Sequence, residues 1–160
     1  MDTVGWIVEH VDQTYKQGNW AGRGALPALE GVTTEESAWR PNAEQKTIGE
    51  IALHMAYWKD AVTARTSGQP WEYNEETNWR PVAATARGWE EARAELHRAH
   101  ERLLRVLRSL TPQRLSEVIG KAWWLEDGQA RVIDWAVGAA HHDMYHAAQI
   151  FVLRRLYQQR

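Results

Sequence analysis

The sequence contains no cysteine. This absence excludes disulfide bonds, thiolate metal sites and a cysteine nucleophile within the chain. Any metal ion must therefore be held by imidazole, carboxylate, carbonyl or water ligands. Phenylalanine is also scarce, with one residue against ten tryptophans. We interpret the tryptophans mainly as large packing side chains whose indole N–H groups need partners, with a carbohydrate or aromatic ligand surface as the alternative.

The sequence also lacks a strong charge bias and a long apolar run. Its formal net charge of -2 gives no electrostatic signature of nucleic-acid or anionic-membrane binding. No apolar run approaches the roughly 18 residues of a membrane-spanning helix. The beginning, MDTVGWIVEHVDQ, carries acidic residues where a signal peptide carries basic ones. We therefore expect a cytoplasmic protein without nucleic-acid or membrane partners, in which residues 1–160 form one domain.

Four segments have helical periodicity, with expected bounds of 2–17, 47–67, 82–109 and 132–158. Thr47 and Glu50 are three residues apart and predict a capping box at the start of the second helix. Shorter helical turns are expected near residues 24–30 and in TTEESAW, and a polar loop at 69–81. Short strands are an option around the turn EDGQ. The predicted fold class is all-α, an antiparallel four-helix bundle with long connecting loops.

Two histidines stand on the apolar side of the last helix. His142 and His146 are four residues apart, so their rings point the same way. His54 takes the same kind of inward position on the second helix. A buried imidazole needs a hydrogen-bond partner or a metal ion. Together the three residues predict a three-histidine metal site with an open position for water or substrate, which is typical of catalytic zinc sites.

Other residues near these histidines are candidates for support or for the pocket wall. Glu50 lies one turn before His54 and could accept a ligand N–H or act as a base, although the capping box already explains it. Asp143 follows His142 directly, faces about 100° away, and is expected to pair across helices. Trp58, Tyr145 and Gln149 are candidates for lining the pocket, and packing alone would also explain Tyr145 and Gln149.

The remaining histidines are interpreted differently. His97 and His100 lie among charged residues in AELHRAHERL and are expected to be solvated. His141 is one position away from the inward stripe and is expected to point elsewhere.

Two long segments carry a family resemblance. They are AWRPNAEQKTIGEIALHMAYWKDAVTARTSG in the middle and GAAHHDMYHAAQIFVLRR near the end. The Arg-Pro entry, the Thr-Ile-x-Glu-Ile cap, the helical histidine after it and the final His-Asp-x-Tyr-His-x-x-Gln-Ile pattern occur in this order. In these features the chain resembles the DinB/YfiT-like superfamily of metal-dependent enzymes, which is unrelated to the DNA polymerase that shares the DinB name.

The resemblance implies that His54, His142 and His146 occupy the family's three metal-ligand positions. It also implies a four-helix bundle, a small-molecule substrate, and the homodimer that is common in the family. Three imidazoles suit Zn or Ni, and also Fe. One departure is Ala21, which stands where relatives often have a histidine in a Trp-His-Gly segment. Any role of that histidine is absent or reassigned here.

Three functions remain open at this point. The first is a metal-dependent hydrolase or thiol S-transferase, in which metal-bound water or a thiolate reacts. The resemblance implies the thiol chemistry, and because the chain has no cysteine, the thiol must be an external low-molecular-weight cosubstrate. The second is a non-catalytic metal- or ligand-binding bundle in stress response. The third is a structural protein whose histidines are satisfied by hydrogen bonds.

Overall fold

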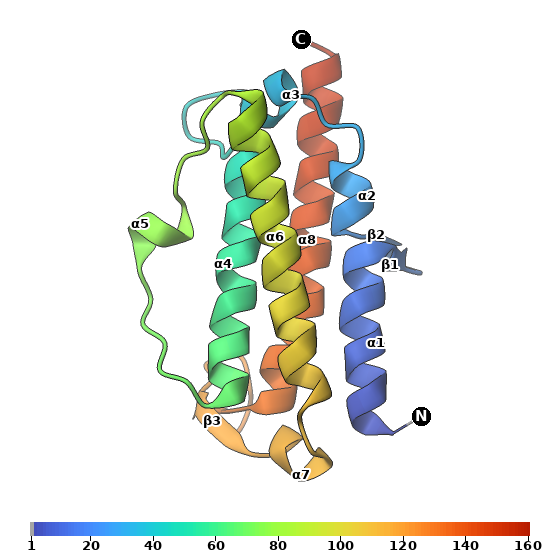
Figure 1. Cartoon of the computed structure of the whole chain (residues 1–160), viewed down its shortest axis with the longest axis vertical. Helices are drawn as coiled ribbons and strands as arrows, with labels where there is room; N and C mark the ends of the chain where they lie inside the picture. Colours follow the sequence, from blue (N-terminus) through green and yellow to red (C-terminus); the bar gives the residue numbers. More distant parts are fainter. Residues whose placement is uncertain (1) are drawn as a thin grey trace.

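The computed structural model describes residues 2–160 and is built on four long helices (Figure 1). The prediction of an all-α bundle is confirmed, and each long helix lies close to its expected bounds. The third long helix begins four residues later than expected because the Thr85 hydroxyl accepts the Gly88 N–H and starts it there. The four helices are α1 Thr3–Lys16, α4 Ile48–Ser67, α6 Ala86–Arg108 and α8 Val132–Gln158.

The four long helices do not simply alternate in direction. Helix α8 runs antiparallel to α4, and α1 runs antiparallel to α6 (Figure 1). The neighbours α4 and α6 run in the same direction, however, because residues 68–85 return along the length of the bundle before α6 begins. Helices α1 and α8 are parallel for the same reason. The long connection therefore lies along one side of α4, where it can cover residues of that helix.

Short helices and two-strand pairs connect the long helices. The helical turns expected near residues 24–30 and in TTEESAW are present, and so are the strands on either side of EDGQ. The segment expected to be a loop at 69–81 contains one helical turn. Asn74 caps the start of this turn, because its side chain accepts the Thr77 N–H. The short elements are β1 Gly18–Asn19, β2 Gly22–Arg23, α2 Ala25–Leu29, α3 Thr34–Ala38, α5 Glu75–Asn78, α7 Pro112–Leu115, β3 Val118–Lys121 and β4 Gln129–Arg131; β1 pairs with β2 and β3 with β4, both antiparallel.

The capping box that starts α4 is confirmed. The Thr47 hydroxyl accepts the Glu50 N–H at 3.1 Å, and the Glu50 carboxylate accepts the Thr47 N–H at 2.8 Å. Both side chains are buried, so the pair satisfies backbone donors that water could not reach. This cap fixes where α4 begins and hence the height of His54 within the bundle. Across residues 2–160, no helix is both long enough and apolar enough to cross a membrane.

The prediction that His100 is solvated is wrong, whereas His97 is exposed as expected. His100 has 0% exposure, stacks on Tyr15 with 3.9 Å between ring centroids, and lies 3.0 Å from an Asp12 carboxylate oxygen. It occupies the inward stripe of α6 between Leu96 and Leu103, at spacings of four and three residues. The charged residues beside it in the sequence, Arg98 and Glu101, are exposed and half-buried, and they do not determine its environment.

Candidate metal centre

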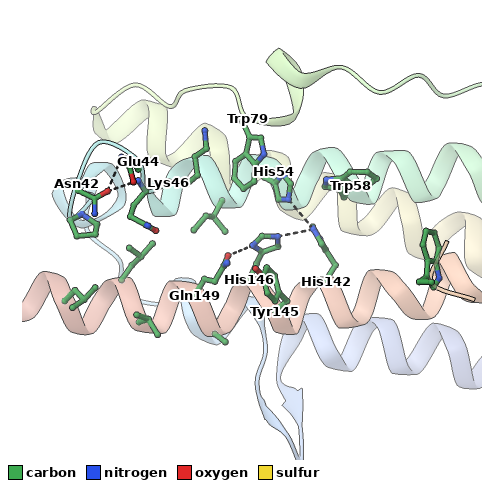
Figure 2. A pocket seen from close by; sticks show the side chains of 18 of the residues that line it. Asn42, Glu44, Lys46, His54, Trp58, Trp79, His142, Tyr145, His146 and Gln149 are labelled. Atoms are coloured by element: carbon green, nitrogen blue, oxygen red, sulfur yellow. Dashed lines mark hydrogen bonds between the residues drawn. The ribbon is translucent and has the colours of Figure 1, made fainter. Parts of the chain in front are cut away.

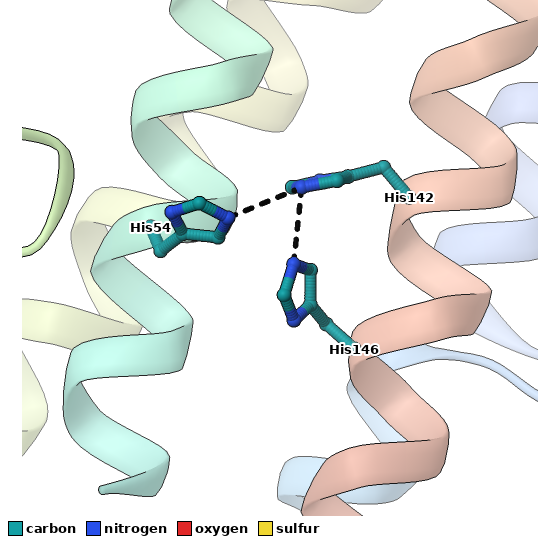
Figure 3. Close-up of side chains that lie close together, drawn as sticks. All are labelled: His54, His142 and His146. Carbon is teal, nitrogen blue, oxygen red and sulfur yellow. Dashed lines mark hydrogen bonds between the residues drawn. The ribbon is translucent and has the colours of Figure 1, made fainter. Parts of the chain in front are cut away.

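Three histidines from two helices meet between α4 and α8. His54 projects from α4, while His142 and His146 project from successive turns of α8 (Figure 3). The Nε2 atom of His142 lies 3.3 Å from that of His54 and 3.0 Å from that of His146. One nitrogen from each ring lies within 4.8 Å of the other two, so the three residues could hold one metal ion. The structure therefore brings together the three histidines predicted from the sequence.

Burial keeps these imidazoles neutral. Removal from water, with a smaller effect of the nearby His146, lowers the pKa of His54 to about 4. Burial followed by the charges of His146 and His54 lowers the pKa of His142 to about 2. Burial also lowers the pKa of His146, although its hydrogen bond to Gln149 opposes this change. At neutral pH the three rings therefore carry lone pairs, which is the form that binds metals.

The outer nitrogens of two rings face amide side chains. Gln149 Oε1 lies 2.7 Å from His146 Nδ1; this oxygen can only accept, so Nδ1 carries the proton and Nε2 presents its lone pair to the other rings. His54 Nδ1 is buried without a hydrogen-bond partner among residues 2–160, and so is the neighbouring Asn78 Oδ1. Asn78 raises the pKa of His54 against the larger effect of burial. If His54 Nδ1 carries the proton and faces Asn78 Oδ1, the lone pair of His54 Nε2 is free to bind a metal ion.

This donor set fits a divalent ion of intermediate softness. Its ligating atoms are nitrogens of neutral imidazole rings. Two of these rings, His146 and His54, have an amide side chain near the outer nitrogen. Without an ion, a proton on His142 Nε2 can be donated to only one of the two facing nitrogens, so at least one of the three is left without a partner. Zn, Ni and Fe accept such ligands, and three protein ligands leave further positions open.

Aromatic side chains from α4, α8 and the 68–85 connection surround the histidines. The Trp79 indole stacks on His54 with 3.7 Å between centroids and 7° between planes. Trp58 lies edge-on to both His54 and His142, at 6.4 Å and 6.2 Å. Tyr145 lies edge-on to His146 but is 62% exposed, so it stands at the rim. The walls are therefore rigid indoles, and one of them directly supports a candidate ligand.

A large open pocket adjoins the three rings (Figure 2). Its volume is about 1220 Å³, which is ample for a small molecule. Besides the histidines, its lining includes Trp58, Trp79, Tyr145 and Gln149. The candidate metal centre is thus accessible to a ligand and is not sealed inside the bundle. The lining therefore includes the three residues that the sequence suggested for the pocket wall, namely Trp58, Tyr145 and Gln149.

Two predicted supporting residues lie elsewhere. The Glu50 carboxylate is engaged by the Thr47 N–H and by Arg40, with 3.2 Å between Arg40 Nη2 and Glu50 Oε2, so it serves the helix cap. Asp143 pairs with Lys59 of α4 at 2.6 Å, and both side chains are buried. The expected pairing of Asp143 across helices is therefore seen.

Position 21 does not reach the histidine pocket in this chain. Ala21 lines a separate hollow together with Gly22, Met144 and Tyr145. The two hollows share three lining residues, which are Tyr145, Ala148 and Val152.

Sequence reasoning missed Asn78 and Trp79 as neighbours of the site. Both belong to the connection 68–85, whose path along α4 depends on the parallel arrangement of α4 and α6. The only available signal was the length and aromatic content of the expected loop. Nothing in the local sequence specifies which of its tryptophans returns to His54.

The fold and the site define an all-α bundle protein with a three-histidine centre that could hold a metal ion. The chain matches the DinB superfamily over residues 17–150, and it belongs to that superfamily. Its fold is similar to the crystal structure of the conserved protein of locus from Enterococcus faecalis, with a TM-score of 0.73 and 16% sequence identity. The similarity covers 100% of this chain and 99% of the other. No curated protein matches the sequence.

Proposed function

We propose that this protein is a metal-dependent enzyme that acts on a small molecule, with His54, His142 and His146 as the metal ligands. The observation that carries the proposal is the convergence of three neutral imidazole nitrogens within 4.8 Å of one another beside an open pocket. Zn or Ni is the expected ion, and Fe is also compatible with these ligands. Burial of His54 and His146 and membership of the DinB superfamily support the same proposal.

A divalent ion in this position would supply a Lewis acid that activates water or an external thiol. The chain's own residues would prepare the site. Gln149 holds the His146 ring in one tautomer and orientation. Trp79 covers one face of the His54 ring and Trp58 lies edge-on beside it, so both restrict its rotation. Because the sequence has no cysteine, thiol transfer would require a low-molecular-weight thiol from outside.

Metal analysis of untagged protein tests the ligand set. We expect about one Zn or Ni ion per chain in the wild type and a loss of that ion in His146→Ala. His97→Ala is the matched control, because His97 is an exposed histidine of α6 away from the site. Wild-type protein that takes up neither metal when each is supplied would reject the proposal.

Activity assays with the metal-loaded protein then separate catalysis from simple binding. Hydrolysis of ester and amide substrates should be compared with transfer of an added thiol, since both remain candidate reactions. Stoichiometric metal with no turnover in either assay would favour the non-catalytic binding bundle in stress response. The homodimer implied by the family resemblance stays a prediction that sedimentation of the same sample would test.

A further inference from the structure

The histidine pocket continues between α4 and α8 into a second hollow of about 190 Å³. Four residues line both spaces, namely Trp58, Trp124, Trp135 and His142. At roughly 30 Å³ per water molecule, the second hollow has room for about six waters, or for one small functional group of a ligand. We call this second space the tryptophan hollow.

Three indole rings meet in the tryptophan hollow. Trp124 and Trp135 lie edge-on to each other, with 6.0 Å between centroids and 85° between planes, so they form two sides of a corner. Trp58 belongs to α4 and meets His142 edge-on at 6.2 Å. Trp124 is 47% exposed, so the fold leaves indole surface uncovered here. The face of an indole attracts a cation within about 6 Å of the ring centre, most strongly where water is excluded.

The charged residues that line the hollow also favour a positive ligand. They are Asp134 and Lys59. Lys59 Nζ is already paired with Asp143 at 2.6 Å, and both side chains are buried, so this pair contributes no net charge. Asp134 is half-buried, and its one hydrogen bond among residues 2–160 accepts the Arg131 N–H through Oδ2 at 2.7 Å. The other carboxylate oxygen, Oδ1, therefore has no donor from the protein.

Two arginines near the hollow do not line it. The Arg65 guanidinium carbon lies 4.6 Å from the Trp135 ring centre, and Arg131 Nη1 lies 4.0 Å from Asp134 Oδ2. Arg131 also pairs with Asp127, which offsets part of its charge. These two cations weaken the attraction of Asp134 for a further cation but do not fill the space beside it. The indoles must therefore supply much of the attraction.

The scarcity of hydrogen-bond acceptors limits the kind of cation. Asp134 carries the one carboxylate in the lining that is not already paired with a basic residue of the lining. A primary ammonium brings three N–H donors, and any that stay unpaired in an apolar space are unfavourable. A quaternary ammonium brings no donor and presents apolar methyl groups to the indoles. The lining therefore fits a quaternary ammonium better than a primary one.

We propose that the tryptophan hollow binds a quaternary ammonium group of the substrate. The methyl groups contact Trp124 and Trp135, the Asp134 carboxylate balances the charge, and the rest of the molecule extends toward the histidines. Asp134 and His142 are on the same helix, about 12 Å apart along its axis at 1.5 Å per residue, which sets the length of such a ligand. This inference rests on the proposed function, since it names the substrate class of that same site.

Calorimetric titration of the full-length protein, after removal of metal with EDTA, tests the inference. The probes are choline and its neutral counterpart 3,3-dimethylbutan-1-ol, in which carbon replaces the charged nitrogen. We expect the wild type to bind choline at least tenfold more tightly than the alcohol. Asp134→Asn keeps an oxygen that can accept the Arg131 N–H, and it should weaken choline binding about tenfold while changing binding of the alcohol less than twofold. Equal binding of the two probes by the wild type would overturn the proposal.

Matched variants test the location and the kind of cation. Trp124→Leu removes an indole but keeps an apolar side chain, and it should weaken choline binding at least fivefold. Trp123→Leu is its control and should change neither probe, because Trp123 is 93% exposed and lines neither space. Glu44 is the acidic residue that lines the histidine pocket at its opposite end. A selective loss of choline binding in Glu44→Gln, and not in Asp134→Asn, would overturn the assignment to the hollow. Binding of ethanolamine, a primary ammonium, as tightly as choline would overturn the assignment to a quaternary group.

The metal-free titration separates this inference from the proposed function. Choline binding by a protein that takes up no metal would retain the tryptophan hollow as a cation site and reject the metal centre. No choline binding, in protein that does take up metal, would reject the cation site and retain the metal centre. Melting temperatures within a few degrees of wild type would establish that each variant is folded.

Discussion

At the scale of single residues, the side-chain amide of Gln149 orients the candidate metal ligand His146. Its Oε1 lies 2.7 Å from His146 Nδ1 and so determines which ring nitrogen is free to bind. We predict that Gln149→Leu weakens Zn affinity about 10- to 100-fold without unfolding the protein, because the ring loses its orienting acceptor. Competition with a chromogenic chelator measures the change.

Two further variants make the Gln149 test specific. Gln149→Glu keeps an acceptor oxygen and should retain wild-type affinity within a few fold. Gln158→Leu makes the same substitution at an exposed position of α8 and should have no effect on Zn binding. Equal affinities for wild type and Gln149→Leu would mean that His146 is oriented by packing alone.

At the scale of elements, the contact between α4 and α8 contains a buried ion pair. Lys59 Nζ lies 2.6 Å from Asp143 Oδ2, and Lys59 also lies 4.9 Å from the centre of the Tyr15 ring. We predict that Lys59→Met lowers the free energy of unfolding by about 3–5 kcal/mol, because it leaves the Asp143 carboxylate buried without a partner. Urea denaturation of the metal-free protein measures this loss.

The double variant Lys59→Met/Asp143→Leu distinguishes the pair from simple packing. It removes both charges, so most of the lost stability should return. A double variant less stable than Lys59→Met would show that the pair stabilises the α4–α8 contact beyond the burial of apolar groups. The stability of this contact also matters for the candidate metal centre, because the packing of α4 against α8 brings His54 close to His142 and His146.

Elements determined by local chemistry could be predicted from the sequence, and elements determined by distant partners could not. The start of α4 follows from Thr47 and Glu50, which bond to each other's backbone three residues apart. The inward histidines of α8 follow from helical periodicity. The burial of His100, in contrast, depends on Tyr15 and Asp12 of another helix. Its charged sequence neighbours suggested the opposite environment.

The same distinction explains what was missed at the site. Trp79 reaches His54 only because the connection 68–85 returns along α4, and that path is a property of the chain's topology. A pattern read in short windows carries no information about it. The three candidate ligands could be predicted because they lie on the inward faces of α4 and α8, and these two helices pack against each other.

At the scale of the whole molecule, the buried histidines link stability to pH. Burial first, then the charge of Lys59, lowers the pKa of His100 to about 3, and burial lowers the pKa of His54 to about 4. The pKa values of His142 and His146 are lowered as well. In the unfolded chain these rings titrate near 6.5. Below that pH the unfolded chain therefore binds protons that the folded protein does not bind, and stability must fall.

We predict that the free energy of unfolding of the metal-free protein decreases as the pH is lowered from 6.5 toward 4. The slope should reach about 1.4 kcal/mol per pH unit for each histidine that stays neutral in the fold. Urea denaturation at several pH values measures it. His100→Gln should reduce this slope by the contribution of one histidine. It should leave the candidate metal centre unchanged, since His100 lies between α1 and α6. Stability that is flat between pH 7.5 and 5 would mean that the folded protein admits protons to these rings, and the neutral ligand set would then lose its physical basis.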